Sequence, residues 1–203
     1  MSILSLFRKN PQVVAGTLLF LAGSIAIMGI ITAEIFYPSG YTTSNSEISD
    51  LGSTRPPNSI IMQPSATIFN STMIITGIMT LISAYCIFLV SKKLIFNIPF
   101  SLFGLGVLGV GIFPGNIEVL HPIFALITFI SGGIAAITSS KILDVPFKYI
   151  SILFGIIALF FLFSAGFFIP IFGDGGTERW VAYPIVMWLT GFGGYLLGNN
   201  SKH

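Results

Sequence analysis

The chain has 203 residues, of which 54% are hydrophobic and 8% are charged, with a mean hydropathy of +0.93 and a formal net charge of +2. A soluble domain carries about 25% charged residues and needs a polar exterior, so this composition excludes a water-soluble globular fold. It favours a protein that lies in a lipid bilayer, where a spanning helix takes roughly 20 mostly apolar residues.

Six apolar runs are long enough to predict membrane spans. Their approximate bounds are 13–37, 68–90, 94–113, 122–140, 147–172 and 181–197. Strands of a membrane barrel would alternate polar and apolar residues over about 10 positions, whereas these runs are apolar all round. The sequence therefore predicts an all-α fold: one integral membrane domain over residues 1–203, built as a polytopic transmembrane six-helix bundle.

The basic residues predict the orientation of this bundle. With a cytoplasmic N-terminus, the outer segments hold only Arg55 and Arg179, whereas the inner segments hold seven basic residues: Arg8, Lys9, Lys92, Lys93, Lys141, Lys148 and Lys202. Positive charge is enriched on the cytoplasmic side of membrane proteins. We therefore expect a multi-pass protein of the cell membrane with both termini cytoplasmic and one long, structured outer loop, 38–67, between the first two helices.

The same charge distribution and the scarcity of certain residues exclude several functions. Topology explains the basic residues, so the high isoelectric point gives no support for nucleic-acid binding. Two histidines, His121 and His203, are too few within the spans for a haem with two His ligands or a three-His zinc site. Cys86 is the only cysteine, and no lysine lies inside a span. We expect no cofactor and no metal.

Rows of glycine lie in the third and sixth spans. The segment GLGVLG at 104–109 matches the letters of a dinucleotide fingerprint, but it lies inside a span and has no strand before it. Small residues let helix backbones approach closely in lipid. We expect these glycines and GFGG at 191–194 to make the third and sixth spans neighbours, or to pack against partner subunits or another copy of the chain.

The remaining polar residues gather in the predicted outer segments. In SEISDLGSTRPPNSI, at 46–60, the letters SDLG are typical of a tight turn in which the Asp50 carboxylate accepts hydrogen bonds from nearby backbone amides. Glu118 and His121 are three residues apart, so on a helix they would share one face, where a carboxylate can orient a His for acid–base chemistry. Arg179 can pair with Asp50 or bind a lipid phosphate. The simpler interpretation is that all of them are solvated loop residues.

Five segments carry a resemblance to a known family. YPSGY, ISDLGS, IFNSTMIITG, GIFPGNIEVLH and GGTERWVAYPIVMW, in this order, resemble six-helix membrane proteins common in archaea and catalogued as domain of unknown function 998. The resemblance extends over residues 15–197 and implies the fold and topology but no activity. The chain is more distantly similar to the eukaryotic damage-regulated autophagy modulator group, whose first outer loop has a comparable pattern. Some proteins of that group act in lipid remodelling, which implies lipids as ligands.

We expect a polar pocket on the outer face that binds or processes a membrane lipid or another amphiphile. The candidate catalytic residues are His121, as general base, and Glu118; the candidate ligand-binding residues are Ser49, Asp50, Arg55, Asn70 and Arg179. Six outer acids against two cations favour a zwitterionic or sugar headgroup over a bare phosphate. The alternatives are a non-catalytic accessory or scaffold subunit of a membrane complex and a small transporter, and the sequence leaves open whether the protein is an enzyme.

The topology can be tested by cysteine labelling. A Ser44→Cys variant should react with a membrane-impermeant thiol reagent added to the outside of intact cells, because residue 44 lies in the predicted outer loop. Labelling from the cytoplasmic face alone would overturn the orientation.

Overall fold

The computed structural model describes residues 10–200, and these form six α-helices and two short 3₁₀ helices, with no strand among them. The elements are α2 (Pro11–Ile35), η1 (Ile48–Leu51), α3 (Ser65–Ser91), α4 (Leu94–Ile112), α5 (Leu120–Thr138), η2 (Ser139–Lys141), α6 (Phe147–Phe163) and α7 (Ala165–Asn200). The prediction of an all-helical chain is confirmed. Helices α2, α3, α4 and α7, and α5 together with η2, are long and apolar enough to cross a membrane, whereas α6 is apolar but has 17 residues.

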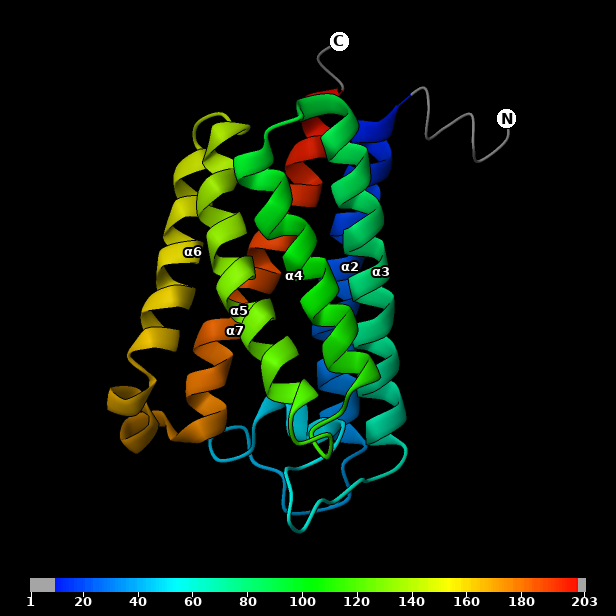
Figure 1. Ribbon diagram of the computed structural model, residues 1–203, viewed down its shortest axis with the longest axis vertical. Coiled ribbons are helices and arrows are strands. Elements are labelled where there is room, and N and C mark those ends of the chain that lie inside the picture. The colour runs from blue at the N-terminus through cyan, green and yellow to red at the C-terminus, as the bar shows by residue number, and fades with distance from the viewer. Residues whose placement is uncertain (1–9, 201–203) are drawn as a thin grey trace.

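The helices form a closed ring in which each packs against the next along the chain and α7 returns to α2 (Figure 1). The first turn of α2 and the last turn of α7 lie at the same end of the bundle. Residues 36–64, which join α2 to α3 and contain η1, lie at the opposite end; we call this segment the cap. Because most of the other connections are short, the order of the helices around the bundle follows the chain.

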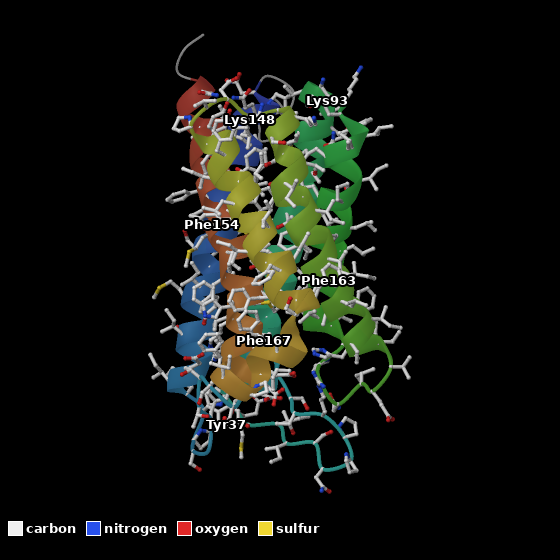
Figure 2. All side chains as sticks on the ribbon, turned by 90° about the vertical axis from the view of Figure 1, so that its left-hand side faces the viewer. Tyr37, Lys93, Lys148, Phe154, Phe163 and Phe167 are labelled. Atoms are coloured by element: carbon white, nitrogen blue, oxygen red, sulfur yellow. The ribbon has the colours of Figure 1, made fainter. Side chains whose placement is uncertain are left out.

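Charge separates between the two ends of the bundle. Lys93 and Lys148 lie at the end opposite the cap, and Tyr37 lies at the cap end (Figure 2). This is the separation that the positive-inside argument requires. Which end faces the cytoplasm stays a prediction.

The expected glycine contact between the third and sixth spans is wrong. Gly106 of α4 lies against Thr128 of α5, and Gly193 of α7 lies against Phe20 of α2. Helices α4 and α7 meet instead through large aromatic side chains in the core, such as Phe100 and Trp188, whose ring centroids are 5.9 Å apart. The glycines thus serve neighbours within the chain, because adjacent helices of the ring need the closest backbone approach.

The predicted fifth span, 147–172, is also wrong at its end. Helix α6 stops at Phe163, and Ser164 leaves the helical conformation with φ −105° and ψ 17°. The chain then turns into α7, which is broken at Gly173, with φ 77° and ψ 172°. The apolar run continued through this turn, so hydropathy alone joined two helices.

Residues after this break were expected to form a loop, but they are the first turns of the long part of α7. Gly173 takes a positive φ that other residues rarely adopt. Gly175 and Gly176 lie directly beneath the cap, where a Cβ on Gly175 would collide with the carbonyl oxygen of Ser46. The N–H of Gly176 donates to the carbonyl of Ser44 at 3.0 Å. The glycines therefore let the cap backbone rest on α7.

A substitution at Gly77 tests how tightly the ring is packed. A Cβ on Gly77 of α3 would lie 2.5 Å from the backbone nitrogen and 2.7 Å from the Cα of Leu108 in α4. We expect Gly77→Ala to lower the free energy of unfolding by roughly 1–3 kcal/mol, since backbone atoms must move. Gly166→Ala is the control, because a Cβ there meets nothing within 4 Å. Equal unfolding midpoints for the two variants in nanodiscs would contradict the close approach.

Candidate functional site

Arg179 of α7 joins three parts of the chain at the cap end. Its Nη2 donates to Glu34 Oε1 of α2 and to the hydroxyl of Tyr41 in the cap, each at 2.6 Å. Its Nη1 donates to three backbone carbonyl oxygens, those of Thr43 at 2.8 Å, Ser46 at 3.0 Å and Gly175 at 3.0 Å. One guanidinium therefore holds α2, the cap and α7 together.

The ion pair of Arg179 differs from the one that the sequence suggested. Its carboxylate partner is Glu34 rather than Asp50, and the side chains of Arg179 and Glu34 are only 10% and 22% exposed. Charge attraction is stronger in such a setting than at an open surface. Tyr41 extends the link, because its hydroxyl donates to the carbonyl oxygen of Glu47 at 3.0 Å. Burial raises the pKa of the Tyr41 phenol, so the phenol keeps its proton as a donor.

The tight turn predicted at Asp50 forms, and the backbone amide that binds the Asp50 carboxylate lies before it in the chain. Asp50 Oδ2 accepts a hydrogen bond from the N–H of Glu47, three residues earlier, at 2.9 Å, and the Glu47 side chain caps the same turn in return. Arg55 Nη2 donates to both carboxylate oxygens of Glu47, at 2.6 and 2.7 Å. Burial raises the pKa of both the Glu47 and the Asp50 carboxyl, and the charge of Arg55 opposes that rise. The turn is thus an ordered element.

His121 lies inside the bundle and not in a loop. It is the second residue of α5, is 3% exposed, and its Nδ1 is 2.8 Å from the carbonyl oxygen of Phe113. A carbonyl oxygen only accepts, so Nδ1 carries a hydrogen and, in the neutral ring, Nε2 is an acceptor. Within residues 10–200, Nε2 has no hydrogen-bond partner.

The expected pairing of Glu118 with His121 is wrong. Helix α5 begins at Leu120, so Glu118 lies in the preceding turn, where it is exposed, and no hydrogen bond joins it to His121 in the described part of the chain. Asn70 of α3 lies against Gly52 of the cap, and its Oδ1 is buried without a hydrogen-bond partner among the residues described. The ligand-binding role of Asn70 stays a prediction.

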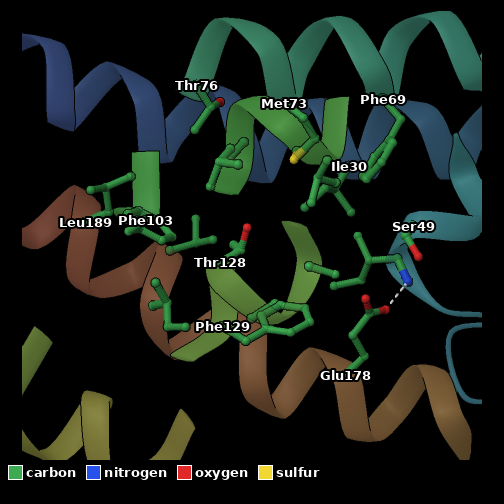
Figure 3. A pocket seen from close by; sticks show the side chains of 18 of the residues that line it. Ile30, Ser49, Phe69, Met73, Thr76, Phe103, Thr128, Phe129, Glu178 and Leu189 are labelled. Carbon is green, nitrogen blue, oxygen red and sulfur yellow. Dashed lines mark hydrogen bonds between the residues drawn. The ribbon is translucent and has the colours of Figure 1, made fainter. Parts of the chain in front are cut away.

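A cavity of about 80 Å³ lies inside the bundle below the cap (Figure 3). Its polar end is formed by Ser49, His121 and Glu178, and the rest of its lining is mostly apolar. Figure 3 shows Ser49 and Glu178 together at one end and Leu189 at the other. The structure therefore places predicted residues Ser49 and His121 at one cavity, whereas Asp50, Arg55, Asn70, Glu118 and Arg179 do not line it.

Glu178 is the cavity residue that sequence reasoning did not select. Its Oε2 accepts a hydrogen bond from the N–H of Ile48 in η1, which is the dashed line in Figure 3. Adjacent residues on a helix point about 100° apart. Because α7 is already helical here, Glu178 faces the cavity while Arg179 faces away from it. The sequence could have indicated this role only if the helix had been predicted to start before residue 178. Glu178 and Arg179 would then have been expected to point in different directions.

A second hollow, a groove of about 490 Å³ that Arg179 lines, lies between α6 and α7. Its polar end contains Arg179 and the cap residues Thr43 and Ser44. Its apolar length is lined by aromatic and aliphatic side chains: Phe154, Ile157, Phe172, Trp180, Tyr183, Pro184 and Met187. The exposure of Trp180 and Met187 makes it a groove in the outer surface of the bundle.

Within residues 10–200, no group of three or more His, Cys, Asp or Glu side chains is placed to hold a metal ion. The polar groups of the cavity and the groove can act as hydrogen-bond donors and acceptors.

The ion pair of Arg179 can be tested against the exposed one of Arg55. Arg179→Ala should lower the free energy of unfolding by roughly 3 kcal/mol, because it leaves Glu34 largely buried without its partner. Arg55→Ala removes a pair in which the arginine side chain is 65% exposed, so we expect a loss below about 1 kcal/mol. Thermal unfolding in nanodiscs measures both, and equal losses would contradict a stabilising role specific to Arg179.

Comparisons with known proteins identify a family without an assigned activity. The family model described as "Protein of unknown function (DUF998)" matches residues 14–195, which is nearly the whole chain. No curated protein and no solved structure matches the chain. The chain therefore belongs to the family DUF998, an uncharacterised family.

Proposed function

We propose that this protein binds a membrane lipid with an electrically neutral headgroup in the groove between α6 and α7. The observation that carries the proposal is the division of the groove into a polar end below the cap and an apolar length along the two helices. Its volume of about 490 Å³ is within the range of roughly 300–1,000 Å³ that is usual for ligand sites. An amphiphile has the same division between headgroup and chain.

The charge at the cap end favours a neutral headgroup. Both arginines there are already paired with glutamates, Arg55 with Glu47 and Arg179 with Glu34. Four further acids lie at or next to the cap end: Asp50, Glu118, Asp174 and Glu178. The formal net charge of this end, with every acid ionised, is 2 − 6 = −4, and an excess of acids repels an anionic lipid. A zwitterionic or sugar headgroup avoids this repulsion, and the hydroxyls of a sugar also offer hydrogen-bond donors to backbone carbonyls at this end.

The groove also suits a lipid because of where it opens. Trp180 and Tyr183 line it near its polar end, and such side chains favour the boundary between membrane and water. Met187 and Phe154 continue the lining along the helices. With the cap outside, as the basic residues predict, the lipid would come from the outer leaflet of the cell membrane. We propose binding and not catalysis, because His121 lies at the inner cavity and away from this groove.

Lipid retention tests the proposal. Protein purified from membranes that contain phosphatidylcholine, a glycosyl diacylglycerol and phosphatidylglycerol should retain the first two over the third in native mass spectrometry. Met187→Trp should reduce this retention severalfold by filling the apolar length. Met28→Trp on α2 is the matched control, since Met28 is 59% and Met187 50% exposed and Met28 lies outside the groove. Preferred retention of phosphatidylglycerol, or the same loss in both variants, would overturn the proposal.

A further inference from the structure

Three polar atoms at the cap end of the interior cavity have no hydrogen-bond partner within residues 10–200. They are Glu178 Oε1, His121 Nε2 and Ser49 Oγ. Their neighbouring atoms are bonded, since Glu178 Oε2 accepts from Ile48 and His121 Nδ1 donates to Phe113. Each of the three can accept a hydrogen bond. The cavity therefore presents acceptors to whatever occupies it.

Glu178 adds a carboxyl that lines the cavity and has no bonded cation, and a cation bound beside it would favour its ionised form. Arg179, its neighbour in sequence, is directed to Glu34, and Arg55 is directed to Glu47. A charge inside a protein is costly unless a partner compensates it. His121, with its side chain 3% exposed and Nδ1–H bonded to a carbonyl, offers a lone pair and no positive charge when neutral. The polar end of the cavity is thus suited to a small cation that donates hydrogen bonds.

The size and walls of the cavity limit the rest of the ligand. About 80 Å³ is roughly half the volume of a cavity of about 150 Å³ that holds benzene. Beyond the polar end the walls are mostly apolar, with Ile30, Phe69 and Met73 among them (Figure 3). The hydroxyls of Thr76 and Thr128 also line the cavity, and each donates to a backbone carbonyl of a helix. The largely apolar walls match an aliphatic chain of about three carbons.

We propose that the interior cavity binds a short aliphatic primary ammonium ion, with its nitrogen at Glu178, His121 and Ser49. A primary ammonium has three N–H donors, and the cavity has three free acceptors. With the ammonium bound, the ionised carboxyl of Glu178 supplies the opposite charge, and the apolar walls hold the carbon chain. This site is distinct from the lipid groove, because Glu178 lines the cavity and not the groove, whereas Arg179 lines the groove and not the cavity.

Three small probes test separately whether binding needs the positive charge and whether it needs the N–H donors. We expect n-propylammonium to raise the midpoint of thermal unfolding in nanodiscs and to give saturation-transfer signals from its methyl protons. n-Propanol lacks the charge, and tetramethylammonium lacks the N–H donors, so both should bind at least tenfold more weakly. Equal binding of either one would overturn the proposal.

Variants locate the site. Glu178→Gln keeps an acceptor for the N–H of Ile48, so we expect it to fold and to bind n-propylammonium at least tenfold more weakly. Ser49→Ala removes a hydroxyl that has no partner among the described residues, and it should weaken binding severalfold. Ala125→Leu should abolish binding by filling the cavity without lowering the unfolding midpoint, because Ala125 lines it.

A matched acid provides the control. Glu118→Gln removes an exposed carboxylate near the same end of the bundle, and it should leave binding unchanged. Undiminished binding in Glu178→Gln, or persistence of binding in Ala125→Leu, would overturn the proposal. Lipid retention in the groove is measured in a separate experiment, so either proposal can fail while the other still holds.

Discussion

The guanidinium of Arg179 is the interaction on which the organisation of the cap end depends. The cap has few apolar residues of its own to bury; Ile48 and Leu51 are its main contribution to the core. Polar contacts must therefore hold it, and Arg179 supplies five of them to α2, the cap and α7. Because the pair with Glu34 is largely buried, these contacts are worth more than the exposed pair of Arg55 and Glu47.

Because the residues after Gly173 are helical, Arg179 and its neighbour Glu178 line two separate hollows. Glu178 and Arg179 are adjacent in sequence but face different sides of the helix, one toward the cavity and one toward the groove. The cap contributes to both hollows, with Ile48 and Ser49 lining the cavity and Thr43 and Ser44 lining the groove. The cap, held by Arg179, therefore contributes to two chemically different hollows. The interior cavity contains the carboxyl of Glu178, and the surface groove contains Arg179, which is paired with Glu34.

The structure separates the two residues for which the sequence suggested acid–base chemistry, and a catalytic role of His121 stays a prediction. A general base needs a nearby group to orient it and access to a substrate proton. His121 is oriented by the carbonyl oxygen of Phe113 and is enclosed, and Glu118 is exposed in a turn. The polar groups at this end are arranged mainly as hydrogen-bonding partners of one another and of the backbone. Most of the glycines that suggested a partner subunit contact neighbouring helices of the ring, and a partner subunit stays a prediction.

The sequence by itself determined the class and the helices, because apolar length is a local property that hydropathy records directly: α2 to α5 begin and end close to the predicted spans. It also predicted an ordered turn at Asp50 from local turn chemistry. Tertiary structure alone decided the partners of Arg179, the burial of His121 and the role of Glu178. These depend on where α7 becomes helical beneath the cap, and three glycines there hid that start from any local pattern.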